Sequence, residues 1–293
     1  MVDNWLKEYI NNIEKQIEIY FPEINDCGYK TVSDASRYSL TLGGKRIRPI
    51  ILLEFCRMLG GDINKAAPFA VALEMIHTYS LIHDDLPCMD NDDMRRGKPS
   101  CHIKYGEDTA LLAGDTLLTE AFGILTKADL PPERIVKAVE YLSSLSGLHG
   151  MIGGQVLDLS FEKITPTADQ LIDMYSRKTG GLLIAAATLG CIAAGMFDQK
   201  TIENAKNYAN NLGLAFQIID DILDCTADQN LLGKPVGSDE KNNKTTFVTI
   251  YGIEKSRQLA KEFTDCALNS LNTLSGDKIK LIELTEYLLK RNY

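Results

Sequence analysis

Apolar residues recur at intervals of three and four positions along most of the chain, which is the spacing that places them on one face of an α-helix. Leu6, Ile10, Ile13 and Ile17 follow this spacing, and Pro22 ends the helix because proline cannot continue it. Sustained alternation of apolar and polar residues, the pattern of a β-strand, is absent from the sequence. We therefore predict an all-α fold. Helices are expected over residues 5–20, 33–42, 49–59, 64–85 and 108–125. A further helix is expected to start after residue 132 and continue through the glycine pair 153–154, and another to run from 167 to about 181. One more helix is expected to end near residue 224, and two last helices lie between there and residue 290.

Glycine and proline mark the expected ends of several helices. The glycine pair 43–44 closes the second helix, because glycine readily adopts the left-handed conformation found there. Pro87 disfavours helical backbone at the residue before it and ends or kinks the helix at that point. The glycine pair 180–181 interrupts the helix that Thr167 and Gln170 begin with the spacing of a capping box.

One long apolar stretch, residues 181–197, is rich in small side chains. It is shorter than the ~20 residues that a membrane-spanning helix needs. Small side chains also suit close packing between helices, so we predict a buried central helix and no membrane span.

Composition narrows the class of protein. The 293 residues are 45% hydrophobic, enough for a large core, and we expect a single domain over residues 1–293. The formal net charge of −9 argues against nucleic-acid binding, which depends on clustered lysine and arginine. The N-terminal segment has the pattern of an amphipathic helix and not of a secretory leader. Seven cysteines without a Cys-x-x-Cys pair are typical of thiols in a reducing compartment, so we expect a cytoplasmic protein.

A first cluster of aspartates follows an apolar helical stretch. Asp84 and Asp85 come at the end of the helix predicted over 64–85, and Asp90 lies a few residues further on. On a straight helix, at ~100° per residue, Asp90 would be out of phase with Asp84. We expect it to converge on Asp84 only because Pro87 interrupts the helix.

A second cluster, Asp220, Asp221 and Asp224, repeats this arrangement at the end of another helix. If the two helix ends face one another, each close pair of carboxylates costs ~4 kcal/mol at 4 Å with an effective dielectric of 20. A bridging cation would offset that repulsion. Oxygen ligands without histidine or thiolate favour Mg²⁺, with Mn²⁺ possible, and substrate phosphates commonly complete such a site.

Basic and apolar residues near these clusters indicate the kind of ligand. Lysine and arginine suit phosphate oxygens, and here they stand at breaks between helices. Apolar side chains below the aspartates are expected to line a central cavity. The basic residues and the apolar residues together predict a ligand with a diphosphate head and a hydrocarbon tail. The basic residues are Lys45, Arg48, Arg95, Arg96, Lys178, Lys234 and Lys244, and those of the cavity are Met75, Tyr79, Ser80 and Phe216.

These motifs together resemble the trans-prenyltransferases, or polyprenyl synthases, a family with the isoprenoid synthase type of helical bundle. The resemblance covers nearly the whole chain and is strongest to bacterial farnesyl diphosphate synthases, also called geranyltranstransferases. It implies Mg²⁺-dependent head-to-tail condensation of isopentenyl diphosphate with dimethylallyl and geranyl diphosphate, releasing diphosphate, in isoprenoid biosynthesis. It also implies a homodimer. The matching segments are GGKRIRP, DDLPCMD, RRGKPS, RKTGGL, FQIIDD, DDILD, GKPVGSD and a closing KR.

The resemblance also assigns roles to individual residues. Asp84, Asp85, Asp90, Asp220 and Asp224 would hold Mg²⁺ on the allylic diphosphate, which Arg95, Lys178 and Lys234 would contact. Isopentenyl diphosphate would be bound by Lys45, Arg48, His77 and Arg96 without metal. Thr179 and Gln217 would lie near the allylic carbocation. The expected catalytic set is Asp84, Asp85, Asp90, Lys178, Thr179, Gln217 and Asp220.

Product chain length depends on a position that this resemblance also identifies. The four residues that separate Asp85 from Asp90 occur in both farnesyl and geranylgeranyl synthases, so this spacing does not decide. An aromatic residue five positions before the first aspartate marks the farnesyl type, and here it is Tyr79, with Ser80 next to it. We therefore expect a farnesyl product, with geranylgeranyl diphosphate synthase as the alternative.

Three other readings stay open. A metal-dependent phosphohydrolase is suggested by His77 and by the His83-Asp84 pair, but it would need further histidine ligands. A terpene cyclase would share the first aspartate motif, although its second motif normally mixes Asn, Ser or Thr with Glu. A non-catalytic partner of another prenyltransferase subunit would tend to lose aspartates that this chain keeps.

Overall fold

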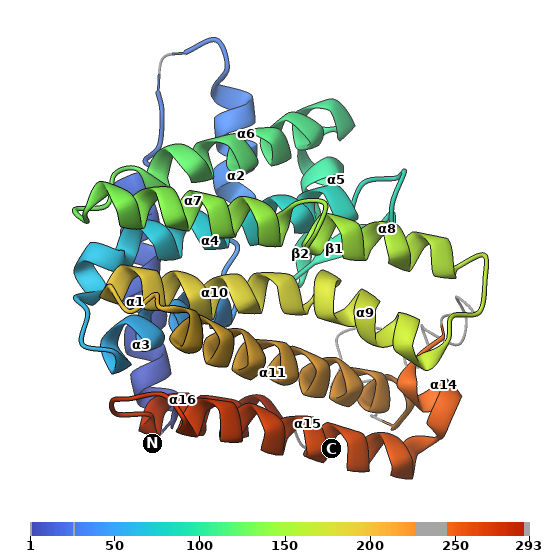
Figure 1. Cartoon of the computed structure of the whole chain (residues 1–293). Helices are drawn as coiled ribbons and strands as arrows, with labels where there is room; N and C mark the ends of the chain where they lie inside the picture. The colour runs from blue at the N-terminus through green and yellow to red at the C-terminus, as the bar shows by residue number, and fades with distance from the viewer. Residues whose placement is uncertain (1, 26, 227–244, 290–293) are drawn as a thin grey trace.

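The structure is a computed structural model of the whole chain, and it describes residues 2–25, 27–226 and 245–289. Regular structure in these ranges is helical apart from one small antiparallel hairpin, which pairs β1 (Met94–Arg95) with β2 (Lys98–Pro99). The predicted all-α fold is confirmed (Figure 1). The helices are α1 (Val2–Tyr20), α2 (Lys30–Leu40), α3 (Ile47–Met58), α4 (Ile63–Asp84), α5 (Cys101–Tyr105), α6 (Glu107–Leu125), α7 (Pro132–Ser146), α8 (Met151–Phe161), α9 (Ala168–Lys178), α10 (Gly180–Ala194), α11 (Gln199–Thr226), α14 (Phe247–Tyr251), α15 (Ile253–Asn272) and α16 (Ile279–Leu289).

Most predicted helices are present, and their ends follow local signals. Asp62 caps α4 by accepting a hydrogen bond from the backbone N–H of Asn64. The predicted capping box at the start of α9 is formed by Thr167 and Gln170. The predicted break beside the glycine pair 180–181 falls at Thr179, between α9 and α10.

Two of the differences between the structure and the sequence-based prediction follow from glycines. The helix expected to run from 132 through 154 is divided into α7 and α8 by a turn over residues 147–150. At Gly150 a Cβ atom would lie 1.8 Å from the carbonyl oxygen of Leu145, so only glycine fits this turn. After residue 244 the chain forms three helices instead of the expected two, because Gly252 separates the short α14 from α15.

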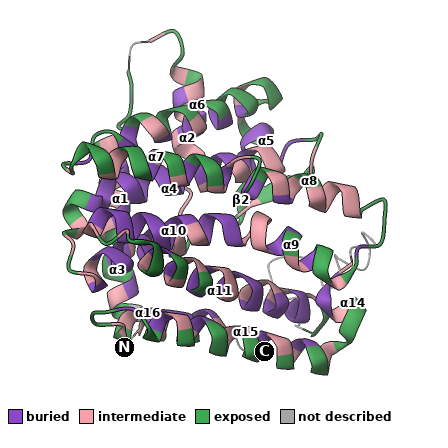
Figure 2. Cartoon of the chain, viewed as in Figure 1, coloured by how far each residue is buried: buried purple, intermediate pink, exposed green. Residues whose placement is uncertain are grey.

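The core is centred on α10, which packs against α3, α7 and α11. Nearly every residue of α10 is buried (Figure 2). The prediction that residues 181–197 form a buried helix is therefore confirmed for Gly181–Ala194. In the part of the chain that the structure describes, no helix is both long enough and apolar enough to cross a membrane.

A buried ionic cluster fixes the start of α3. Arg46, only 2% exposed and in the left-handed conformation, binds Glu74 of α4 and Glu14 of α1. Its Nη2 also donates to the carbonyl oxygen of Leu40, 2.6 Å away. Breaking such a buried network is costly because it leaves a charge without its partners. The cluster thereby holds the backbone from which the neighbouring Lys45 and Arg48 extend.

Candidate active site

The first aspartate cluster is built by the turn that follows α4. Asp84 is the last residue of the helix, and the backbone N–H of Asp90 donates to the carbonyl oxygen of Asp84 at 2.8 Å. The chain thus returns after Pro87, as predicted, and brings Asp90 to Asp84. The pKa of Asp84 is raised to about 6, chiefly by burial and also by the charges of Asp90 and Asp85, against the lowering effect of Lys178 and Arg95.

Asp85 faces a different partner. Its side chain is buried, and both of its carboxylate oxygens accept hydrogen bonds from Nε of Arg95, at 3.0 and 3.1 Å. Arg95 also lies 3.4 Å from Asp92, an aspartate to which sequence analysis assigned no role. Burial raises the pKa of Asp85, which the Arg95 guanidinium opposes. The expected metal-binding role of Asp85 stays a prediction, and in this structure its oxygens bind an arginine.

The second aspartate cluster occupies the last turns of α11. Asp220 and Asp224 are half-buried, whereas Asp221 is only 2% exposed. Asp221 accepts hydrogen bonds from the Tyr175 hydroxyl at 3.0 Å, from Nε2 of Gln217 at 3.3 Å and from the backbone N–H of Phe247 at 3.2 Å. Asp221 therefore joins α9, α11 and α14, a role that sequence analysis did not predict.

The break between α9 and α10 lies next to both aspartate-bearing helices, α4 and α11. Lys178 lines a cavity together with Asp84 of α4, and the hydroxyl of Thr179 donates to Oε1 of Gln217 at 3.1 Å. Gln217 stands one helical turn before Asp220 on α11. Within the described ranges no three His, Cys, Asp or Glu side chains gather closely enough to hold a metal ion by themselves. The expected Mg²⁺ site therefore stays a prediction.

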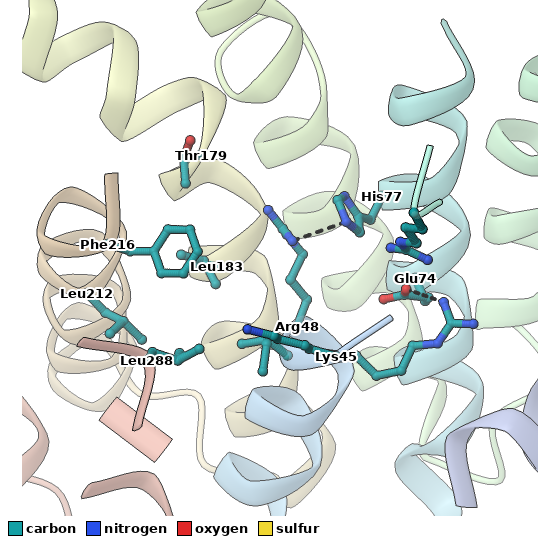
Figure 3. A pocket seen from close by; sticks show the side chains of 12 residues that line it. Lys45, Arg48, Glu74, His77, Thr179, Leu183, Leu212, Phe216 and Leu288 are labelled. Carbon is teal, nitrogen blue, oxygen red and sulfur yellow. Dashed lines mark hydrogen bonds and ion pairs between the residues drawn. The ribbon is translucent and has the colours of Figure 1, made fainter. Parts of the chain in front are cut away.

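A basic cavity of about 180 Å³ lies next to this break (Figure 3). We call it the basic cavity because four of the predicted substrate-binding residues line it: Lys45, Arg48, His77 and Arg96. Glu74, which also lines it, is engaged by Arg46. The apolar wall consists of Leu183, Leu212, Phe216 and Leu288.

Arg48 and His77 contact each other in the wall of the basic cavity. Nη1 of Arg48 lies 3.3 Å from Nε2 of His77, and since a guanidinium only donates, the imidazole nitrogen must accept. Burial lowers the pKa of His77 well below its usual range, and the neighbouring arginines lower it further, so the ring is neutral. Nε of Arg48 is buried without a hydrogen-bond partner among the described residues, which leaves a donor for an anion.

A larger cavity of about 560 Å³ extends from Asp84 between α4, α6 and α8, and we call it the apolar cavity. Tyr79 and Ser80, the two predicted chain-length residues, line it, as do Leu118, Met151 and Leu182. It shares Arg48, His77 and Thr179 with the basic cavity, so the two cavities meet at these three residues. Two expected lining residues lie elsewhere, because Met75 is fully buried in the core and Phe216 lines the basic cavity.

Lys178 and Thr179 also line a third cavity of about 110 Å³ with Gln217. Here Lys178 forms an ion pair with Asp158 of α8, a residue that sequence analysis did not single out. The available signal was weak, since Asp158 follows Gln155 by three positions and so lies on the same helix face. The predicted ligands Lys234 and Lys244 lie outside the described residues.

The all-helical bundle and its two joined cavities, one basic and one apolar, define an enzyme of the isoprenoid synthase type. A model of the family described as polyprenyl synthetase matches residues 29–284. The chain belongs to this family and is a prenyltransferase, which confirms the resemblance seen in its motifs.

Named relatives differ in the product that their names imply. The chain is 44% identical to a geranylgeranyl diphosphate synthase of Cyanophora paradoxa over 89% of its length and 88% of that protein. It is 43% identical to the farnesyl diphosphate synthase of Escherichia coli, covering 89% of each chain. A solved FPP/GFPP synthase of Zymomonas mobilis superposes with a TM-score of 0.88 at 31% identity, covering 98% of each chain.

Proposed function

We propose that this protein is a farnesyl diphosphate synthase, which condenses isopentenyl diphosphate head-to-tail with dimethylallyl and then geranyl diphosphate. The observation that carries the proposal is the junction of the two cavities. A diphosphate in the basic cavity and a hydrocarbon chain in the apolar cavity would bring their reactive ends together beside Arg48, His77 and Thr179. Such positioning is a major part of the catalysis of a two-substrate reaction.

Isopentenyl diphosphate is expected in the basic cavity. Lys45, Arg48 and Arg96 supply positive charge, and Nε–H of Arg48, which has no partner among the described residues, supplies a buried donor. Neutral His77 orients the Arg48 guanidinium by accepting one of its hydrogen bonds. Because these groups are already fixed, little reorganisation is needed when the diphosphate binds.

The allylic diphosphate is expected near Asp84, Asp90, Asp220 and Asp224, with Lys178, Arg95 and Lys234 as cationic partners. Mg²⁺ held by these carboxylates, or Mn²⁺ in its place, would stabilise the negative charge that develops on the departing diphosphate. Lys178 would exchange its Asp158 partner for the diphosphate. Asp85 would also bind Mg²⁺, and it holds Arg95 in position beside the same site.

In the proposed reaction the bond between C1 of the allylic substrate and its diphosphate oxygen breaks, and the double bond of isopentenyl diphosphate attacks C1. A proton is then lost to form the new double bond. The hydroxyl proton of Thr179 points to Gln217, so the lone pairs of the hydroxyl oxygen face away from Gln217. These lone pairs would stabilise an allylic cation that forms nearby. His77 is no obvious base, because its Nε2 already accepts from Arg48, and the departing diphosphate is the expected proton acceptor.

Chain length is the finer part of the proposal. Tyr79 is only 5% exposed and lines the apolar cavity, so its ring would stop a growing chain. A geranylgeranyl product is the alternative, favoured by the name of the Cyanophora paradoxa relative.

We also propose a cytoplasmic homodimer. The exposed apolar residues of α6 and α8, Leu111, Leu112, Ile152 and Val156, support a second copy as the partner. Light scattering after gel filtration would give twice the chain mass.

The phosphohydrolase alternative would need further histidine ligands beside the His83-Asp84 pair. Nε2 of His83 lies 3.0 Å from the carbonyl oxygen of Leu111, and since a carbonyl only accepts, this nitrogen carries a proton. Only Nδ1 of His83 is left as a possible metal ligand, and membership of the polyprenyl synthetase family favours a prenyltransferase.

The direct test is to incubate the purified protein and Mg²⁺ with isopentenyl diphosphate plus dimethylallyl or geranyl diphosphate, and to identify the products by mass. Farnesyl diphosphate supports the proposal, and geranylgeranyl diphosphate supports the alternative. Free phosphate alone would indicate a phosphohydrolase, cyclic hydrocarbons a cyclase, and absence of turnover a non-catalytic partner.

A further inference from the structure

The ring of His83 on α4 packs against Gly114 of α6. A Cβ atom built at Gly114 of α6 would lie 2.0 Å from Nε2 of His83 and 2.4 Å from its Cδ2. Ordinary contacts between such atoms are ~3.5–4.0 Å, so any side chain at residue 114 must displace the imidazole. Gly114 therefore provides a seat for His83.

His83 is held in this seat from two other directions. Its Nε2 donates to the carbonyl oxygen of Leu111, one turn before Gly114. Its ring packs edge-on against the ring of Tyr79, with centroids 5.7 Å apart and planes at 75°. Edge-to-face contacts of this kind are favourable for aromatic rings. The imidazole thus connects the backbone of α6 to Tyr79.

Tyr79 depends on packing for its position. Its hydroxyl is buried and makes no hydrogen bond to any of the described residues. Burial raises the pKa of this phenol to about 12, so it is neutral. No polar anchor among those residues fixes the ring, and His83 packs edge-on against it. Both rings line the apolar cavity, which Leu118 of α6, one turn after Gly114, also lines.

We propose that His83 and its glycine seat at residue 114 set the position of Tyr79 and thereby help determine product chain length. This inference rests on the proposed synthase activity and deepens it. His83 is a positioning residue, because it acts on the growing chain through Tyr79. A larger side chain at residue 114 pushes the imidazole away from α6, toward Tyr79 and the cavity. Loss of the imidazole removes a side chain that packs against Tyr79, so the Tyr79 ring can move away from the growing hydrocarbon chain.

The two perturbations are expected to shift product length in opposite directions. Gly114→Ala narrows the cavity and shortens the main product by one isoprene unit relative to the unmodified enzyme. His83→Ala lengthens it by one unit. The double variant behaves like His83→Ala, because the new methyl group then meets empty space.

Gly123→Ala is the matched control. It makes the same change on the same helix, but the nearest atom to the new Cβ is Oε2 of Glu120 at 4.0 Å. Products of each variant are identified by mass after incubation with isopentenyl and dimethylallyl diphosphate, because geranyl diphosphate already has the length that Gly114→Ala is expected to give. The control must retain the product distribution of the unmodified enzyme, since otherwise the shift at residue 114 is not specific.

Several outcomes decide the matter. Unchanged products in both Gly114→Ala and His83→Ala overturn the inference, as does a shift in Gly114→Ala that persists in the double variant. If Gly114→Ala does not fold, recovery of folding and longer products in the double variant still support it. If the unmodified enzyme makes no elongated diphosphate, the proposed function fails first and this inference falls with it. If the unmodified enzyme elongates its substrate but the variants make the same products, only this inference is refuted, and the proposed function stands.

Discussion

Replacing Asp221 with asparagine tests whether this buried carboxylate sets the orientation of the Gln217 amide. A carboxylate only accepts hydrogen bonds, so Gln217 turns its Nε2 toward Asp221 and its Oε1 toward Thr179. Asparagine presents one carbonyl oxygen and one NH₂ group in the same space. Either Gln217 or the backbone N–H of Phe247 then loses its acceptor, or the Gln217 amide turns over.

The expected size of the effect follows from these contacts. A buried donor left without an acceptor costs about 1–3 kcal/mol of stability. In a large domain this lowers Tm by about 2–4 °C for each kcal/mol. If the amide turns over, Nε2 faces Thr179, whose hydroxyl must then accept, and its proton is redirected away from Gln217. A dipole reversed beside a developing cation is expected to lower kcat about tenfold, which corresponds to ~1.4 kcal/mol.

The assay combines steady-state kinetics with thermal unfolding. Tyr175→Phe is the control, because it removes one donor from the same carboxylate but leaves both oxygens for Gln217 and Phe247. We expect both variants to lose a few degrees in Tm and only Asp221→Asn to lose kcat, with KM for isopentenyl diphosphate unchanged. Wild-type kcat in Asp221→Asn, or an equal loss of kcat in Tyr175→Phe, would refute the reasoning.

Three further predictions concern the two cavities. Tyr79→Ala opens the apolar cavity and is expected to lengthen the products, and an unchanged product distribution by mass would contradict this. Arg48→Lys keeps the charge but loses the Nε–H and the bond to His77, so KM for isopentenyl diphosphate should rise about tenfold or more while KM for the allylic substrate stays constant, as initial rates would show. Asp84 has a pKa raised from 3.8 to about 6, so its ionised form destabilises the metal-free fold above that pH and has no such effect near pH 4. Without metal, Asp84→Asn should therefore increase the free energy of unfolding at pH 8 by up to about 3 kcal/mol and should leave it unchanged at pH 4, as denaturant titrations would test. The same substitution should abolish turnover in a rate assay.

Much of the fold could be predicted because the responsible signals are local. Helical periodicity located most helices, the capping box at Thr167 marked the start of α9, and the glycine pair 180–181 marked its end. The return of Asp90 to Asp84 was predictable because proline restricts the residue before it. The turn that separates α7 from α8 was missed, because the close approach of Leu145 that requires Gly150 is not visible in any periodic pattern.

The sequence alone determined which chemical groups are present and on which helix ends they stand. Acidic and basic residues next to helix breaks, with apolar residues below them, predicted a diphosphate ligand with a hydrocarbon tail, and the motif segments predicted the family. Their partners were decided by the tertiary structure, because hydrogen bonds and ion pairs depend on contacts between distant segments. Only in the folded chain does Asp85 bind Arg95, does Asp221 accept a hydrogen bond from Gln217, and does His83 pack against Gly114. Two neighbouring aspartates of the same motif thus have different surroundings, since one ends the helix beside Lys178 and the other turns into the protein.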